Sequence, residues 1–201
     1  RFDINPVLQI PFTKWPFLTI NSSIGWRGTY WTESLDPFGN TVSQIDEGIG
    51  RSFFDVQSHI TGPSFVKVWE TPNSSYSERM KHVIEPWVTL QRTSAVDDFN
   101  RIVQLEGIDA IVGGVTQVRY GINNRIYAKQ PSGNDVSVAR EILSVGIEQS
   151  YYTDANASQF DRRFRTSFNN TTPSNVSPVS LVVRTEPKRS LSGSMRAEYD
   201  T

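Results

Sequence analysis

The sequence predicts an all-β protein: an antiparallel, up-and-down transmembrane β-barrel segment of about eight long strands, part of a larger barrel. Three observations carry this prediction. Apolar and polar residues alternate over long stretches, which separates the two faces of a β-strand. Several of these stretches run to about ten residues or more, the length that a tilted strand needs to cross a bilayer. The connections alternate short and long, as in outer-membrane barrels. We expect residues 1–201 to form one such segment.

The most regular alternation lies in two expected strands, 112–129 and 138–152, joined by the turn-rich residues 130–135. In the first strand one parity is apolar: Val118, Tyr120, Ile122, Ile126 and Ala128. In the second strand the apolar parity holds Leu143, Val145, Ile147 and Tyr151. The opposite parity of both strands carries full charges, so we expect a sheet with one apolar face and one wet, charged face.

The first half of the chain supplies four further strands. We expect strands at 2–10, 18–33, 54–69 and 82–92, with a bend or bulge in the third at Gly62-Pro63. Pro6 and Pro11 remove ladder donors, which argues against a central, fully paired position for the first strand. Long polar connections are expected at 34–50 and 94–107.

The chain ends on two more strands. Residues 153–177 form the longest expected loop, followed by strands at 178–186 and 191–200 around a short turn. Aromatic residues near expected strand ends resemble the interfacial girdles of membrane barrels: Trp15, Phe17, Tyr30, Trp31, Trp69, Tyr127, Tyr151 and Tyr152.

Composition excludes several classes of protein. The net charge is −1, so no electrostatic footprint for nucleic acid is present. The chain has no cysteine, which excludes disulfides and thiolate metal sites, and no apolar run long enough for a membrane helix. Because both ends fall within alternating patterns, we expect a fragment of a longer chain.

No enzymatic motif is present. His59 and His82, the only histidines, lack metal-ligand spacing, and we expect both to be ordinary polar residues. Asp46-Glu47 and Asp97-Asp98 lie in expected loops and read as solvated carboxylates, with divalent-cation binding as the alternative. No G-x-S-x-G elbow and no phosphate-binding loop in a strand–helix context occurs. We therefore predict no enzyme, no catalytic or metal site and no cofactor.

The functional candidate is the charged face. Its members are polar or charged residues expected to face a barrel lumen: Arg27, Asp55, Arg119, Asn123, Arg125, Arg140, Glu148, Arg184, Arg196 and Glu198. Ion pairs that stiffen the wall are the alternative for each arginine. A soluble antiparallel β-sandwich, such as a carbohydrate-binding module, would carry such a face on its solvent side. An unrelated barrel, such as a porin or an adhesin translocator, fits the same pattern.

One succession of segments resembles a known family. His82–Pro86 reads H-x-I-E-P, Arg119–Lys129 carries N-N-R, and Arg140–Leu143 with Glu148–Tyr152 reads R-E-x-L and Q-x-Y-Y. In this order they are similar to the outer-membrane lipopolysaccharide-assembly protein family LptD (OstA), from about Gly62 to the end. The specificity lies in the succession and not in any single motif.

The resemblance implies a location and partners. It implies a very large barrel in the bacterial outer membrane, which receives lipopolysaccharide from periplasmic bridge proteins and releases it into the outer leaflet among outer-membrane lipids. It also implies a plug lipoprotein inside the barrel. Arg119, Arg125, Arg140, Arg184 and Arg196 would be the first choices for headgroup contacts, because arginine matches phosphate geometry. The family's cysteine linkage cannot be carried over to a chain without cysteine, nor can its lateral gate.

Overall fold

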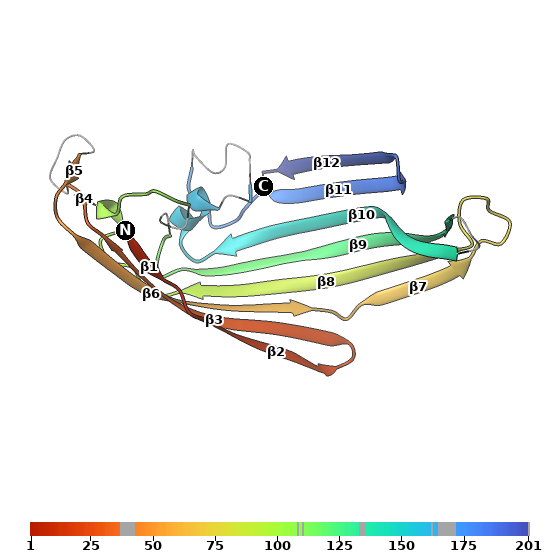
Figure 1. The fold of residues 1–201 in the computed structure, drawn as a ribbon, viewed down its shortest axis with the longest axis horizontal. Helices are drawn as coiled ribbons and strands as arrows, with labels where there is room; N and C mark the ends of the chain where they lie inside the picture. Colours follow the sequence, from red (N-terminus) through yellow and green to blue (C-terminus); the bar gives the residue numbers. More distant parts are fainter. Residues whose placement is uncertain are drawn as a thin grey trace.

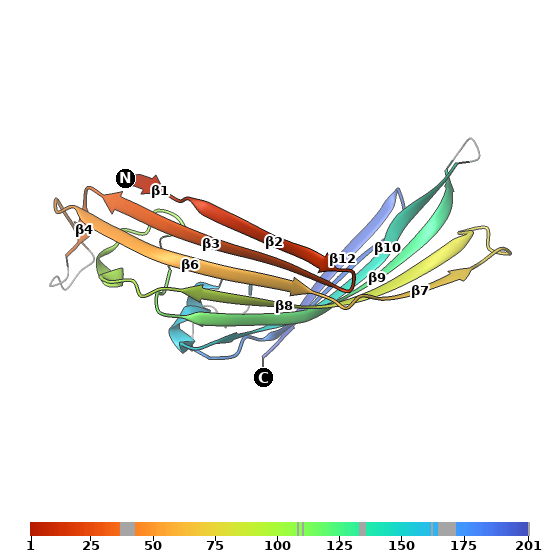
Figure 2. The same cartoon turned by 90° about the horizontal axis from the view of Figure 1, so that it is seen from below.

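The computed structural model describes residues 1–36, 43–107, 109, 111–132, 136–161, 163–164 and 172–200. They form one curved antiparallel sheet of ten strands and a separate two-stranded hairpin (Figures 1 and 2). The all-β, antiparallel fold expected from the sequence is confirmed. The strands of the main sheet are β1 (Phe2–Ile4), β2 (Val7–Trp15), β3 (Leu18–Trp31), β6 (Ile49–Thr61), β7 (Phe65–Glu70), β8 (Arg79–Thr93), β9 (Thr116–Ser132), β10 (Val136–Tyr152), β11 (Val179–Lys188) and β12 (Leu191–Tyr199).

The strands follow one another through the sheet in chain order. The order is β1-β3-β6-β8-β9-β10-β11-β12; β2 extends β1 along β3, and β7 extends β6 along β8. β1 and β2 are two parts of one interrupted strand, and so are β6 and β7. Counted in this way, the ten strands correspond to the eight up-and-down strands that the sequence predicts. The sheet is open, with β2 and β12 on opposite edges in Figure 1. Pro6 and Pro11 lie on the first edge, as expected.

The interruption between β6 and β7 lies at the expected bend. Gly62 has a φ of 114°, a conformation that favours glycine. A Cβ at this position would stand 2.3 Å from the carbonyl oxygen of Phe17. The turn between β2 and β3 therefore packs against a position where only glycine fits.

The expected loop at 34–50 contains more structure than the sequence indicates. Its described part holds the hairpin of β4 (Ser34–Leu35) and β5 (Gln44–Ile45), and β6 begins at Ile49, not at Phe54. The start of β6 was missed because Gly48 and Gly50 read as loop residues. Residues 94–115 include the 3₁₀ turn η1 (Phe99–Arg101), and residues 153–178 include η2 (Ala155–Phe160).

Long and short connections lie at opposite ends of the sheet. Residues 32–48, 94–115 and 153–178 join strands at one end, on the left in Figure 1. The turns at 16–17, 71–78 and 189–190 lie at the other end. The alternation of lengths along the sequence thus becomes a separation in space.

Candidate functional site

Strand register assigns each residue to a face. Cross-strand partners share a face, and the pairs Ile24–Val56, Val88–Tyr120 and Ile122–Ile147 link one apolar face from β3 to β10. The pairs Gly25–Asp55, Thr89–Arg119 and Gly121–Glu148 link the opposite face. We call these the apolar face and the charged face.

Burial is inverted between the two faces. Apart from Ala128, the buried residues in the described strands of the main sheet lie on the charged face: Thr29, Trp31, Ile49, Arg51, Phe53, Val83, Thr89, Thr93, Ser150, Tyr152 and Ser180. The apolar face is exposed, including Phe2, Ile4, Leu8, Ile10, Ile24, Tyr30, Phe54, Val56, Leu90, Tyr120, Ile122, Ile147, Tyr151, Met195 and Tyr199. A sheet folded for water would bury the apolar face instead.

Nine of the ten predicted site residues fall on the charged face by register: Arg27, Asp55, Arg119, Asn123, Arg125, Glu148, Arg184, Arg196 and Glu198. Arg140 differs. A register shift between Glu141 and Leu143 breaks the alternation that placed Arg140 with Ser144, and Arg140 stands opposite Ala128 instead. Its guanidinium contacts the carboxylate of Glu186. A one-residue bulge of this kind leaves no clear sequence signal.

The centre of the charged face is a hollow of about 400 Å³ that brings together Arg119, Asn123, Arg125 and Glu148. The Arg119 guanidinium lies over the Trp87 ring, 5.2 Å from its centroid. In the described part of the chain, Arg119 Nε and Trp87 Nε1 are buried without a hydrogen-bond partner. The Trp87 ring reaches across Gly121, where an added Cβ would meet a ring carbon at 2.8 Å. Gly121 thus makes room for this stack.

Carboxylates contact other polar groups of the charged face, both at this hollow and farther along the sheet. Arg125 lies 3.3 Å from Glu85 and 3.9 Å from Glu141, measured between guanidinium nitrogen and carboxylate oxygen. Asp55 accepts hydrogen bonds at one oxygen from Gln91 at 2.8 Å and from Thr93 at 3.0 Å. Arg125 is therefore engaged in a wall ion pair, the alternative that the sequence left open, whereas Asp55 has no ion pair among the described residues.

The charged face continues onto the last two strands. Arg196 donates to Glu198 at 2.6 Å and also to the backbone carbonyl of Arg163. Arg184 makes no ion pair with any described residue and lines a second hollow of about 390 Å³ between β10, β11 and β12. Of the predicted arginines, Arg119 and Arg184 thus remain without an ion pair in the part of the chain that the structure describes.

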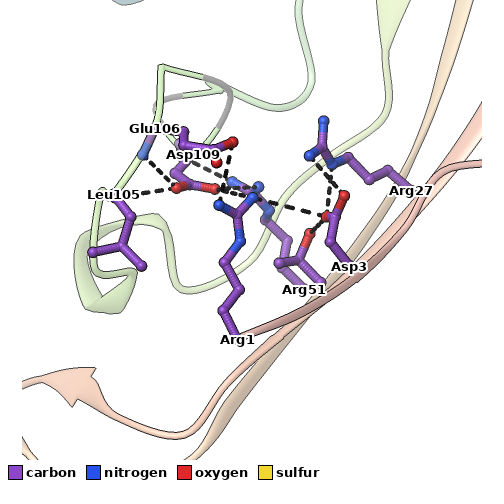
Figure 3. A network of polar contacts seen from close by, with 8 residues as sticks. Arg1, Asp3, Arg27, Arg51, Leu105, Glu106 and Asp109 are labelled. Atoms are coloured by element: carbon purple, nitrogen blue, oxygen red, sulfur yellow. Dashed lines mark hydrogen bonds and ion pairs between the residues drawn. The ribbon is translucent and has the colours of Figure 1, made fainter.

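A cluster that the sequence did not predict lies where the long connections meet the sheet (Figure 3). Asp109 is fully buried, and its carboxylate lies 3.1 Å from Arg1 and 3.7 Å from Arg51. Asp3 accepts two hydrogen bonds from Arg27, at 2.9 and 2.8 Å. Asp109 was missed because it belongs to a connection with no periodic pattern, and only the fold brings it to β6.

Three aromatic residues expected at an interfacial girdle lie on the charged face by register: Trp31, Tyr127 and Tyr152. Trp31 and Tyr152 are each 2% exposed, on the charged face and beneath the long connections. The Tyr152 hydroxyl donates to Asp161 at 2.5 Å. The girdle prediction is wrong for these three residues, because their parity follows the charged face, whereas Tyr30 and Tyr151 lie on the exposed apolar face.

Neither a helical span nor a metal cluster is found in the described ranges. No helix there is long and apolar enough to cross a membrane. No group of three or more His, Asp or Glu side chains there could hold a metal ion.

Comparisons with known proteins do not assign the chain. No protein-family model matches it, and no curated protein matches it either. The resemblance of its segments to the lipopolysaccharide-assembly family therefore stays a prediction.

Proposed function

We propose that the chain is a wall segment of a large outer-membrane β-barrel that carries lipopolysaccharide to the bacterial surface without enzymatic chemistry. In this proposal the apolar face contacts lipid, and the charged face borders a water-filled lumen. The observation that carries it is the uneven burial of the two faces: large apolar side chains of the apolar face are exposed, whereas nearly all buried strand residues lie on the charged face, among them Arg51 and several serines and threonines beside Trp31, Phe53 and Tyr152.

The apolar face has the properties of a lipid-facing surface. Its large exposed members are aromatic and aliphatic and lie on strands from β1 to β12. By register the face also holds two arginines, Arg92 opposite Val56 and Arg140 opposite Ala128. Monomeric soluble proteins rarely expose apolar patches larger than a few hundred Å². A hydrocarbon environment removes this cost, because the tails of lipids are as apolar as the side chains they contact.

Strand length and loop placement agree with a bilayer crossing. β9 and β10 have 17 residues each, β8 has 15 and β3 has 14. A tilted transmembrane strand needs about 9–11 residues. Outer-membrane barrels place short turns on the periplasmic side and long loops outside, which matches the separation of connections in Figure 1. In this proposal the end with the long connections faces the cell exterior.

The cargo is inferred from the resemblance of the segments around Glu85, Asn123 and Gln149. The chemistry of the charged face is compatible with it. Arg119 presents a guanidinium without an ion pair among the described residues, beside the amide of Asn123. Guanidinium groups bind phosphate oxygens in bidentate fashion, and amides bind hydroxyl groups. The plug lipoprotein and the periplasmic bridge proteins enter the proposal through the same resemblance.

The soluble sandwich receives less support than the barrel. It requires a second sheet packed on the apolar face, and among the described residues the other sheet is the two-stranded hairpin of β4 and β5. A porin would have the same long strands, apolar outer face and charged inner face. Only the cargo distinguishes a porin from the proposed lipopolysaccharide carrier.

The experiment uses the full-length parent protein. Outer membranes are fractionated, and the protein is run on a gel in detergent with and without boiling; a barrel is expected to shift its mobility on boiling. A photo-crosslinking residue at Arg119 should then capture lipopolysaccharide, whereas one at Ile122, on the apolar face, should capture phospholipid or the lipid moiety only. If neither residue forms crosslinks to the sugars of lipopolysaccharide, the proposal that lipopolysaccharide is the cargo is refuted. A protein that stays soluble without detergent would refute the barrel.

A further inference from the structure

Two of the long connections fold back over the charged face. Backbone hydrogen bonds join Thr93 to Val115 and Gly114 to Ser94, closing the base of the 94–115 connection. At the base of the 153–178 connection, backbone hydrogen bonds join Tyr152 to Asn175 and Ser177 to Ser150. Beneath both connections is a cavity of about 690 Å³.

The cavity has a polar floor and a mostly apolar roof. The floor is the charged face, including Arg27, Asp55, Gln91, Thr93 and Gln117. The roof comes from the two connections, including Ile111, Val112, Val115, Ala157 and Phe160. Access to this part of the charged face therefore depends on where the connections stand.

One carboxylate holds the 94–115 connection to the sheet. Asp109 is 0% exposed, and its carboxylate lies beside the guanidinium groups of Arg1 and Arg51. Arg51 also donates to the Asp109 backbone carbonyl at 2.8 Å. The second carboxylate oxygen accepts from the backbone amides of Leu105 and Glu106, at 3.1 and 2.8 Å. Asp109 thus shapes the connection and ties it to β6 through one side chain (Figure 3).

Apolar and aromatic contacts support the same position. Ile102 is buried against Trp31 and Ile49. The Arg51 guanidinium lies 5.0 Å from the centroid of the Trp31 ring, so the ion pair lies directly beside the apolar cluster. Phe99 of η1 meets Phe160 of η2 edge to face, with 5.5 Å between ring centroids. The last contact couples the two connections to each other.

We propose that the described part of the 94–115 connection is a lid over the charged face, latched by the Asp109–Arg51 pair and coupled through Phe99 and Phe160 to the 153–161 segment. Opening the latch exposes the cavity and its polar floor. Because Asp109 belongs to the lid and Arg51 to β6, the pair breaks whenever the lid lifts. The latch itself needs only the observed contacts; its role in controlling passage rests on the proposed function.

The first test measures amide hydrogen exchange of the full-length parent in detergent or bilayers. Asp109→Asn keeps the size of the side chain but removes the negative charge beside the buried Arg51 guanidinium, and losing one partner of a buried ion pair is strongly destabilising. We expect amides of 99–107 to exchange ~100-fold faster, while those of β9 and β10 are unchanged. Asp97→Asn, the same change at an exposed residue of the same connection, should have no effect. Equal exchange in the two variants would overturn the latch.

Phe160→Ala tests the coupling and remains informative if Asp109→Asn fails to fold. The Phe160 ring is 38% exposed, so its loss leaves the core of the sheet intact. We expect faster exchange in 99–107, the segment on the other connection, as well as near residue 160. Faster exchange near residue 160 alone would overturn the coupling.

Conductance of the reconstituted parent separates the lid from the proposed function. Faster exchange together with higher single-channel conductance in Asp109→Asn supports a lid over a lumen. Faster exchange without any conductance change keeps the latch and refutes control of passage, which would count against a lumen on the charged face.

Discussion

Placing an arginine at Ile147 tests the environment of the apolar face. Ile147 lies inside β10, five residues before its end at Tyr152, opposite Ile122 on β9 and Leu181 on β11, and is 49% exposed. Its two cross-strand neighbours are aliphatic, so an arginine there has no carboxylate partner on the same face. The effect of Ile147→Arg therefore depends on whether water or hydrocarbon surrounds the face.

The two environments predict different magnitudes. At a water-exposed position the substitution should change the free energy of unfolding by about 0.5 kcal/mol or less. On the lipid face of a barrel, an arginine near the bilayer midplane costs about 2–4 kcal/mol. The second range corresponds to roughly a 30- to 900-fold shift in the unfolding equilibrium. We expect the larger effect for Ile147→Arg.

The assay is denaturant unfolding of the full-length parent in phospholipid bilayers. Asn123→Arg supplies the matched control, since Asn123 follows Ile122 on β9 and lies opposite Gly146, on the charged face at the same level of the sheet. Tyr151→Arg supplies a depth control, because it stands near the end of β10, where an interfacial arginine costs only about 0–1 kcal/mol. The predicted order of destabilisation is Ile147→Arg, then Tyr151→Arg, then Asn123→Arg.

A soluble sandwich would also be destabilised by a charge on a buried apolar face, but without dependence on depth along the strand or on lipid. Equal destabilisation by Ile147→Arg and Tyr151→Arg, or an effect of Ile147→Arg below about 0.5 kcal/mol, would refute the lipid-facing interpretation.

Three further predictions concern the charged face and its turns. Gly121→Ala should destabilise the fold by about 1–3 kcal/mol, because its Cβ would meet the Ile147 carbonyl oxygen at 2.5 Å; Gly193→Ala, whose nearest contact is an ordinary 3.5 Å, is the control in the same unfolding assay. Arg125→Gln should cost less than about 1 kcal/mol, and less still in high salt, since its ion pairs are partly solvated; a loss that persists in high salt would contradict this. Hydrogen bonds from Ser137 and Lys129 lower the pKa of Glu78 below its ordinary 4.5. The stabilisation that the ionised Glu78 carboxylate gives to the folded state is complete above a pH of about 4.5 and is lost as the pH falls through the lower folded-state pKa. Glu78→Gln should therefore weaken the dependence of the free energy of unfolding on pH below about 4.5. An unchanged pH dependence would contradict these hydrogen bonds.

The fold could be read from the sequence to the extent that side-chain alternation specifies it. Alternation around Ile24, Ile122 and Ile147 predicts long strands and one apolar face, and the short and long connections predict the up-and-down order. It fails where a strand begins with glycines, as at Gly48–Gly50, because residues without side chains carry no alternation. It also fails at the β10 bulge, where one extra residue moves Arg140 out of phase with Ser144.

The candidate site divides along the same line. Arg119, Asn123 and Glu148 could be predicted to share a face because parity alone places them there. Asp109 could not, because its connection to Arg51 spans two strands and an irregular loop. The alternation of residues does not predict ion pairs either. Arg125 and Arg119 share the charged face, yet of these two only Arg125 has ion-pair partners among the described residues.

Cysteine labelling tests the central claim most directly, and the segment itself has no cysteine to remove. Single cysteines replace Ile122 and Asn123, adjacent residues on opposite faces of β9, in the full-length parent lacking other reactive cysteines. Intact outer membranes are treated with a charged, water-soluble maleimide and then with a lipid-soluble one. The account predicts that Asn123→Cys reacts with the first reagent and Ile122→Cys only with the second. Reaction of Ile122→Cys with the charged reagent would place the apolar face in water and contradict the account.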